Sequence, residues 1–327
     1  MTTIIYLVLI FFFSGILVKA TDILIVNLKG LAEKTSLGKF AISSFLIALG
    51  TSLPELIVGL TAALEKQPSL SLGNVIGANI ANLSLVVGGA ALVGGAVTVR
   101  GVFVRRDIFY AFLAGAAPMV LLFDKTLTRV DGLILLFVYG FYNTWVFYER
   151  RKTMAVVTSQ LEKEGFIHRL IRRLNHRGTR REIGWIFLGL ALLLFAGEMI
   201  VRLSKQLAII FNLPLLLVGL LVVSVGTTLP EIIFELKAVR QHQPDMVFGN
   251  LLGSIVANGT LVIGLVAFIS PFRIQAFNEY LLATMAFLII FAAFYFFIHT
   301  KHRLERREGA LLLVFYLAFA LIEFASR

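Results

Sequence analysis

Ten apolar stretches, each long enough to cross a lipid bilayer, run through this chain of 327 residues. A helix needs roughly 20 apolar residues to span about 30 Å of hydrocarbon. Backbone groups in lipid must find partners within the protein, and runs this long without strict alternation are not barrel strands. We therefore predict transmembrane helices over residues 3–27, 40–64, 70–97, 104–123, 131–149, 183–206, 213–237, 246–270, 277–298 and 309–325.

The composition agrees with an all-α polytopic membrane protein whose surroundings are the lipid bilayer. Only 15% of the residues are charged, whereas a soluble domain has about 25%. The chain has no cysteine, which excludes disulfides and thiolate metal sites, and its five histidines form no metal-ligand pattern. The apolar N-terminus lacks a basic leader, so we interpret it as the first span and not as a removed signal peptide.

The basic residues predict the orientation. The net charge of +11 arises from Lys and Arg that lie between the spans, which argues against nucleic-acid binding. If both termini are outside, 22 of the 30 Lys and Arg fall in cytoplasmic segments and 7 in external ones. Because cytoplasmic loops carry the excess of positive charge, we predict that both termini lie outside. We expect the membrane to be a prokaryotic plasma (inner) membrane.

One long polar connection divides the chain. Residues 150–182 mix basic and acidic side chains with a short apolar strip. Their composition favours a cytoplasmic linker with an interfacial helix, and a regulatory element that senses anionic lipid is the alternative. We expect a first five-helix repeat over residues 1–149, this linker, and a second five-helix repeat over residues 183–327.

An internal repeat relates the two halves. The sequence Gly50-Thr51-Ser52-Leu53-Pro54-Glu55 recurs 176 residues later as Gly226-Thr227-Thr228-Leu229-Pro230-Glu231, and the same shift aligns Gly73-Asn74 with Gly249-Asn250 and Ala81-Asn82 with Ala257-Asn258. Five predicted spans separate equivalent positions, so the second copy enters the membrane from the opposite side. Inverted repeats of this kind build many secondary transporters, whose substrates bind at mid-membrane on interrupted helices.

Glu55 and Glu231 each fall inside a predicted span. An acidic residue at mid-span costs roughly 2.5–3.5 kcal/mol on insertion scales, so two at symmetric positions indicate a shared function. Pro54 and Pro230 lack an N–H and clash with the preceding turn, so each should interrupt its helix. The sequence therefore predicts two acidic side chains on broken helices near the bilayer centre.

Oxygen ligands flank both glutamates. The hydroxyls of Thr51, Ser52, Thr227 and Thr228 lie within one turn of them, and we expect the prolines to free main-chain carbonyls near Ala48 and Ser224. A hard cation such as Ca²⁺ takes about 6–8 oxygen ligands, which this set supplies. The repeated asparagines are either interhelical hydrogen-bonding groups or further ligands.

At these motifs the chain resembles the sodium/calcium exchanger branch of the cation/Ca²⁺ exchanger superfamily. The alpha-repeats of that family read G-T-S-L-P-E followed by G-N-x-x-G-S-N-x-x-N/D, and both copies have close counterparts here. The resemblance covers both repeats and the ten-span plan. It implies alternating access, in which spans 1 and 6 slide past the other eight and expose one site to each side in turn.

The resemblance also implies a set of ligands. Those of the family fall on Glu55, Glu231, Thr51, Ser52, Thr227, Thr228, Asn82, Asn258 and Ser254, and on the carbonyls of Ala48 and Ser224. Three positions depart from the family pattern: Ala78 replaces a serine ligand, Ile255 an asparagine, and Asn258 an aspartate. The last change leaves two carboxylates, which neutralise one Ca²⁺ or two Na⁺. The stoichiometry and the preferred ion therefore stay open.

Glu235 is a candidate for the missing charge, because it lies four residues after Glu231 on the same helix face. Its repeat counterpart is Gly59. Its carboxyl either reaches cytoplasmic water near Lys237 or lies on the access path of the ion. Two further acids, Asp22 and Glu198 at matching positions of spans 1 and 6, are interpreted as gate or span-end residues.

Together these features predict a secondary active cation antiporter, not an enzyme, that exchanges Ca²⁺ for Na⁺ at a mid-membrane carboxylate and hydroxyl site. Proton-coupled antiport of Ca²⁺ or another divalent cation is the alternative. Inverted repeats around a central site argue against a passive channel, and no Ser/His or paired-Asp constellation supports an intramembrane enzyme. We expect no cofactor. The transported ions should be Ca²⁺ and Na⁺, or H⁺ in place of Na⁺. The sequence does not indicate the oligomeric state.

Overall fold

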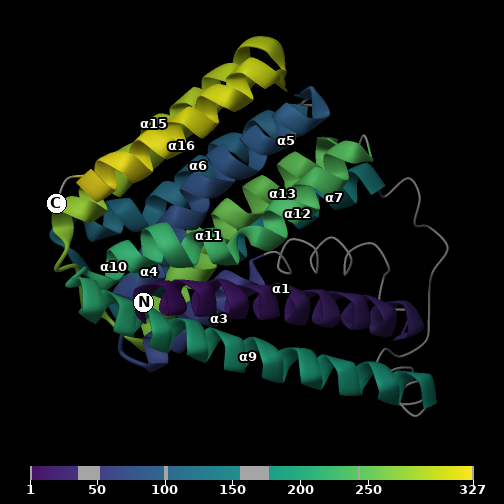
Figure 1. Ribbon diagram of the computed structural model, residues 1–327. Helices are drawn as coiled ribbons and strands as arrows, with labels where there is room; N and C mark the ends of the chain where they lie inside the picture. Colours follow the sequence, from purple (N-terminus) through teal and green to yellow (C-terminus); the bar gives the residue numbers. More distant parts are fainter. Residues whose placement is uncertain (1, 36–51, 99–101, 155–176, 242–243, 326–327) are drawn as a thin grey trace.

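The computed structural model describes residues 2–35, 52–98, 102–154, 177–241 and 244–325. Side chains are described over residues 4–27, 52–98, 108–145, 181–241 and 246–325. Within these ranges a helix accompanies each of the ten predicted spans, although the first half of the span predicted at 40–64 and most of the linker predicted at 150–182 lie outside them (Figure 1).

Both halves of the chain consist of long helices joined by short connections. The first half contains α1 (Thr2–Thr35), α3 (Leu53–Leu64), α4 (Pro68–Ala81), η1 (Asn82–Val86), α5 (Val87–Gly94), β1 (Ala96–Thr98), α6 (Val102–Leu121), η2 (Leu122–Asp124), β2 (Thr126–Leu127) and α7 (Arg129–Met154). The second half contains α9 (Arg177–Phe211), α10 (Leu215–Val218), η3 (Gly219–Val223), α11 (Ser224–Thr227), α12 (Leu229–Arg240), α13 (Pro244–Val256), η4 (Ala257–Val262), α14 (Ile263–Ile269), β3 (Phe272–Arg273), α15 (Phe277–Lys301), β4 (Arg303–Glu305) and α16 (Arg306–Ala325).

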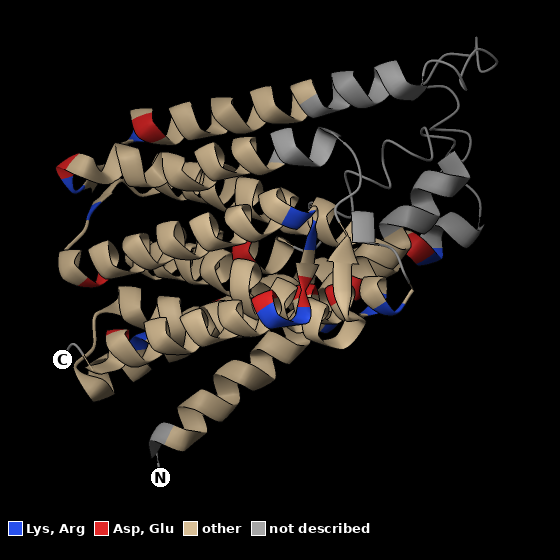
Figure 2. Ribbon diagram, turned by 90° about the horizontal axis from the view of Figure 1, so that it is seen from above, with Lys and Arg blue, Asp and Glu red and all other residues tan. Residues whose placement is uncertain are grey.

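The helices present apolar surface outward, as lipid requires. Seven helical segments of the described chain are long and apolar enough to cross a membrane, and Leu53–Leu64 and Ile108–Asp124 are shorter apolar helices. Large apolar side chains such as Phe137, Leu321 and Ile209 are exposed. Figure 2 shows the helices free of charged residues over most of their length. The prediction of a ten-helix, all-α membrane fold is confirmed.

The helices α1 and α9 lie side by side along one edge of the molecule, separate from most of the other helices (Figure 1). Buried apolar residues form two separate cores. The smaller core joins α1 and α9 to parts of α3 and α10, whereas the larger core unites the remaining spans. The molecule therefore contains a two-helix unit packed against an eight-span body.

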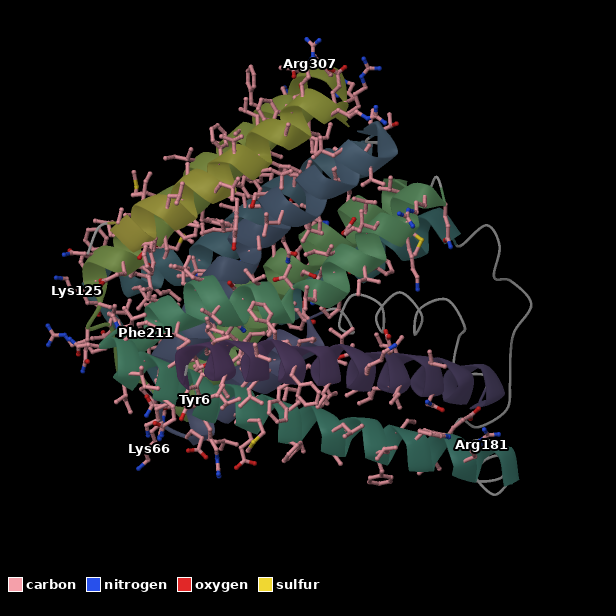
Figure 3. The ribbon with its side chains drawn as sticks, in the orientation of Figure 1. Tyr6, Lys66, Lys125, Arg181, Phe211 and Arg307 are labelled. Carbon is pink, nitrogen blue, oxygen red and sulfur yellow. The ribbon has the colours of Figure 1, made fainter. Side chains whose placement is uncertain are left out.

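The two halves have opposite orientations. Figure 3 places Tyr6, Lys66, Lys125 and Phe211 at one end of the bundle and Arg181 and Arg307 at the other. The helix α3 runs toward the Lys66 end, whereas α12 runs toward the Arg181 end (Figure 1). Packing follows the same symmetry, because α3 packs on η4 and α14 while α12 packs on η1 and α5. This confirms the inverted repeat.

Two short antiparallel ribbons, which the all-helical prediction did not include, tie loops together at the ends of the spans. β1 pairs with β4, with Val97 opposite Leu304, and β2 pairs with β3, with Leu127 opposite Phe272. The 176-residue shift relates one ribbon to the other. Each ribbon links the loop after a broken span to the loop between the last two helices of the opposite half.

Candidate functional site

A helix begins inside each repeated motif, at Leu53 and at Leu229, and in the second motif it directly follows the short helix α11. Pro54 stands in the first turn of α3, after Ser52, and Pro230 stands in the first turn of α12, after Thr228. Proline suits this place because the first helical residues have no intrahelical partner for an N–H. Both glutamates therefore lie in a first turn, where unpaired N–H groups present positive partial charge.

The carboxyl groups of Glu55 and Glu231 are buried inside the protein, close enough for their charges to interact. Their exposed fractions are 0% and 1%. The charge of Glu55 acts directly on the Glu231 carboxyl, and the Thr227 hydroxyl lies beside Glu55. Among the described residues, none of the four carboxyl oxygens has a hydrogen-bond partner. Two carboxyls this deeply buried need a proton or a cation to compensate them.

The two threonine hydroxyls of the second motif lie close to the main-chain carbonyl of Ser224. Thr228 Oγ1 donates to the Ser224 carbonyl over 2.6 Å, and Thr227 Oγ1 approaches the same oxygen at 3.3 Å. The amide N–H of Thr228 donates to it as well, over 3.0 Å. The prediction that Pro230 frees the Ser224 carbonyl is therefore wrong: the carbonyl four residues before a proline is the one deprived of an N–H, and here that is the carbonyl of Gly226.

Asparagine side chains link the broken helices across the centre. Thr227 Oγ1 donates to Asn74 Oδ1 over 3.0 Å, which joins α11 to α4. Asn258 Nδ2 donates to Asn79 Oδ1 over 3.1 Å, which joins η4 to α4. Asn82 is buried, and neither of its amide atoms has a partner in the described part of the chain.

The other predicted ligands are distributed as follows. Ser52 is buried with an unpartnered hydroxyl within the described ranges, and Ser254 is fully buried on α13. Thr51 and Ala48 lie outside the residues whose structure is described. The structure thus brings Glu55, Glu231 and Thr227 together, places Asn82 in η1 and Asn258 in η4, and bonds Thr228 to the Ser224 carbonyl.

Three acidic residues outside the motif have contrasting positions. Glu235 is 1% exposed, so the interpretation that its carboxyl reaches water near Lys237 is wrong: α12 continues to Arg240 and packs on α13 and α5. Asp22 is exposed, and Glu198 forms a surface ion pair with Arg202 over 2.5 Å. The last two therefore lie apart from the buried site.

Sequence reasoning missed three π-helical segments. η1 and η4 occupy equivalent places in the two repeats, since η1 begins at Asn82 and η4 begins at Ala257, within the aligned Ala-Asn pairs; η3 precedes the second motif. In both equivalent segments a hydroxyl bonds the carbonyl four residues earlier: Ser84 to Ile80, and Thr260 to Val256. Such segments cluster at functional sites. The aligned Ser84 and Thr260 were the available signal.

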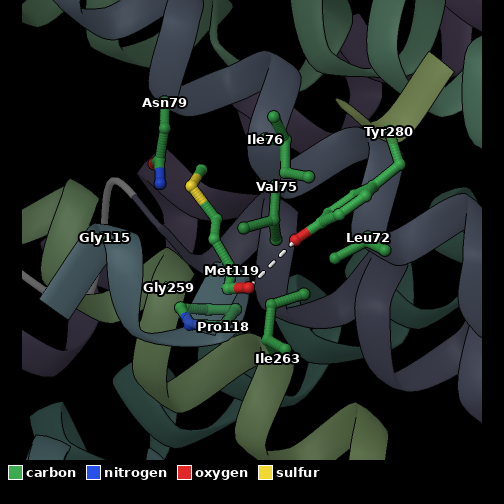
Figure 4. A pocket seen from close by; sticks show the side chains of 10 residues that line it. All are labelled: Leu72, Val75, Ile76, Asn79, Gly115, Pro118, Met119, Gly259, Ile263 and Tyr280. Carbon is green, nitrogen blue, oxygen red and sulfur yellow. Dashed lines mark hydrogen bonds between the residues drawn. The ribbon is translucent and has the colours of Figure 1, made fainter. Parts of the chain in front are cut away.

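A small cavity borders the asparagine pair. Its volume of about 10 Å³ corresponds to about one water molecule. Figure 4 shows Asn79 at one side and the Tyr280 hydroxyl at the other, where it donates to the Met119 carbonyl over 3.4 Å. Gly259, next to Asn258, also lines this space. The cavity connects the surroundings of Asn258 with α6 and α15.

The donor set suits a hard cation that is bound and released. The described residues contain no group of three or more His, Cys, Asp or Glu side chains arranged to hold a metal ion. The site instead combines two buried carboxyls with neutral hydroxyl and amide oxygens. Oxygen-rich sets of this kind suit Ca²⁺ and related hard ions, and neutral ligands keep binding weak enough for release.

Comparisons with known proteins agree with this geometry. The model of the family described as "Sodium/calcium exchanger protein" matches residues 5–148 and 181–325. Inner membrane protein YrbG of Escherichia coli is 32% identical over 231 residues, which cover 70% of this chain and 69% of that protein. Sodium/calcium exchanger MaX1 of Methanosarcina acetivorans is 26% identical over 94% of this chain and 95% of its own.

Solved structures share the fold. The sodium-calcium exchanger NCX_Mj superposes with a TM-score of 0.62 at 23% identity and covers 99% of both chains. The H⁺/Ca²⁺ exchanger CAX superposes with a TM-score of 0.71 at 18% identity, over 98% of this chain and 87% of its own. At these identities the likeness concerns the arrangement of the helices.

Proposed function

The chain belongs to the sodium/calcium exchanger protein family, and from this premise we propose that it is a secondary active antiporter that exchanges Ca²⁺ for Na⁺ by alternating access. Its ligands in this proposal are Glu55, Glu231, Thr51, Ser52, Thr227, Thr228, Asn82, Asn258 and Ser254, together with the carbonyl of Ala48. The carbonyl of Ser224 is left out, because the hydroxyl and the amide N–H of Thr228 already donate to it.

One observation carries this proposal: the carboxyls of Glu55 and Glu231 come from oppositely inserted broken helices, interact with each other, and are buried without described partners. Two negative charges match one Ca²⁺ or two Na⁺. Either load removes the repulsion between the carboxyls, which in a low-dielectric interior is several kcal/mol. In this proposal only a loaded site, with the repulsion removed, changes its access, so the passage of one ion is coupled to the return of the other.

The two-helix unit supplies a moving part. α1 touches the second motif where Ser14 contacts Gly226, since a Cβ on that glycine would collide with the Ser14 side chain. α9 touches α3 where Gly197 faces Ile57, and a Cβ there would lie 2.7 Å from Ile57 Cγ2. Small residues at both contacts leave smooth surfaces, which favours sliding of α1 and α9 past the eight-span body.

Proton coupling is the second candidate. It is favoured by the superposition on an H⁺/Ca²⁺ exchanger and by Asn258, which carries no charge where the family usually has an aspartate. Under this mechanism two protons on Glu55 and Glu231 replace the two Na⁺. The same carboxyls are used, so the candidates differ in the driving ion alone.

Flux into vesicles separates the two mechanisms. With purified protein in liposomes, an outward Na⁺ gradient at equal pH on both sides should drive uptake of radioactive Ca²⁺, and choline in place of Na⁺ should not. Valinomycin and K⁺ hold the membrane potential at zero. Uptake that follows an imposed pH gradient and ignores Na⁺ would replace Na⁺ by H⁺ as the coupling ion.

We place the protein in a prokaryotic plasma membrane with both termini outside. A bacterial relative bears the name of an inner membrane protein, and the basic Arg181 and Arg307 share one end of the bundle. Because the natural chain has no cysteine, single cysteines can be introduced at Lys66 and Arg307. An impermeant maleimide should label the first from outside intact cells; labelling of only the second would reverse the orientation.

A further inference from the structure

Glu235 is a buried acid that the proposed exchange of one Ca²⁺ for two Na⁺ does not use. It lies on α12 one helical turn beyond Glu231, in the direction of the Arg181 end of the bundle (Figures 1 and 3). Its exposed fraction is 1%, and its charge acts on the Glu231 carboxyl. Burying a carboxyl at this depth costs free energy, so its presence here indicates a function.

The surroundings satisfy half of this carboxyl. Asn250 Nδ2 on α13 donates to Glu235 Oε1 over 3.3 Å, while Oε2 is buried and has no partner among the residues described. A carboxyl that was only a packing group would be expected to have both oxygens bonded. The unpartnered oxygen therefore marks a position where a positive ion can be held.

The first repeat has no equivalent group, and the packing explains why. The counterpart of Glu235 is Gly59, where a Cβ would lie 2.8 Å from Val262 Cγ1 and 2.9 Å from Ser71 Oγ. Any side chain at this position would have to displace the side chains of Val262 in η4 and Ser71 in α4. The extra carboxyl is confined to the second repeat, whose Asn258 lacks the charge of the usual aspartate.

We propose that Glu235 and Asn250 form a separate subsite for one monovalent cation, Na⁺, one turn from the Glu55–Glu231 site. This rests on the proposed Na⁺/Ca²⁺ exchange. A single carboxylate matches a single charge, whereas Ca²⁺ would leave one charge uncompensated and requires about 6–8 oxygens. With this subsite the protein binds three positive charges as Na⁺ against two as Ca²⁺, and the additional Na⁺ binds toward the Arg181 end.

Thermal unfolding of the purified protein tests the subsite without requiring transport. Saturating NaCl, compared with choline chloride at equal ionic strength, should raise the Tm of the natural protein, because a ligand that binds only the folded state stabilises it. Glu235→Gln retains an oxygen that accepts from Asn250 and removes the charge. It should lose about one third of the Na⁺-dependent rise in Tm, because one of three bound Na⁺ is lost, and keep the Ca²⁺-dependent rise.

Two further variants complete the experiment. Glu235→Asp, which retains the charge, should recover part of the Na⁺ effect, and Glu65→Gln, at an exposed end of α3, should behave as the natural protein. An undiminished Na⁺ effect in Glu235→Gln, or an equal loss of the Na⁺ and Ca²⁺ effects, would overturn the subsite. Failure of Na⁺-driven Ca²⁺ flux in vesicles would instead remove the proposed exchange and leave this binding result standing.

Discussion

The two repeats share their backbone and their central glutamates but differ in several of the surrounding polar groups. Both place a glutamate in the first turn of a helix, and both have a π-helical segment that begins within the Ala-Asn pair. They differ at Asn79, whose counterpart is Ile255, and at Gly59, whose counterpart is Glu235. The duplicated backbone brings the two carboxyls together. The positions that differ between the repeats change the local charge and the mobility of the amide side chains on each side.

The asparagines show how this inequality acts. Asn258 is held by Asn79, but Ile255 has no group that could hold Asn82 in return. Asn82 accordingly has no hydrogen-bond partner in the described structure, and its amide oxygen is available to a cation. One amide of the pair is therefore fixed in position, and the other is free to adapt to ions of different size.

The largest effect should come from the shared glutamates. Glu55→Gln and Glu231→Gln should each lower cation-dependent flux more than about a hundredfold, since loss of one member of a buried charged set costs about 3–5 kcal/mol. Flux into liposomes, normalised to monodisperse protein, measures this. Equal losses support one shared site, and substantial flux in either variant would remove that glutamate from it.

A smaller effect should follow from restoring the usual acid. Asn258→Asp adds a negative charge beside the two carboxyls, which favours the divalent ion, and we expect the ratio of Ca²⁺ to Na⁺ affinity to rise about tenfold. Competition between the ions in the vesicle assay gives the ratio. Asn82→Asp, on the free amide, is the matched variant. If neither change moves the ratio, these side chains do not face the ion.

The smallest effect should come from breaking the asparagine link. Asn79→Ile makes the first repeat resemble the second and removes a hydrogen bond of about 0.5–1.5 kcal/mol. We expect Ca²⁺ affinity to fall about threefold to tenfold, because Asn258 is then as free as Asn82. Equilibrium binding of Ca²⁺ measures the change. An effect as large as that of Glu55→Gln would mean that Asn79 is itself a ligand.

Much of the fold was accessible from the sequence because membrane spans and repeats leave strong local signals. Apolar length located the helices, and the aligned Pro and Glu residues placed the breaks at α3 and α12. The apolar pattern could not reveal the π-helical segments, since one extra residue in a turn of a span buried on all sides leaves no mark on it; only the aligned Ser84 and Thr260 pointed to them.

The errors concerned contacts between neighbouring groups. The expectation for Ser224 assumed that the proline acts at that carbonyl, whereas Thr228 still supplies an N–H to it. The expectation for Glu235 rested on its closeness to Lys237 in sequence, whereas its burial depends on packing by α13 and α5. The Asn79–Asn258 bond joins residues 179 positions apart, which spacing within one helix does not predict.

The central claim is that Glu55 and Glu231 bind one and the same Ca²⁺. Calorimetric titration of Ca²⁺ into purified protein, without Na⁺, tests this most directly. The natural protein should bind one Ca²⁺ per chain, and Glu55→Gln and Glu231→Gln should each abolish binding. Two Ca²⁺ per chain, with either single variant retaining one, would show two independent sites and contradict the claim.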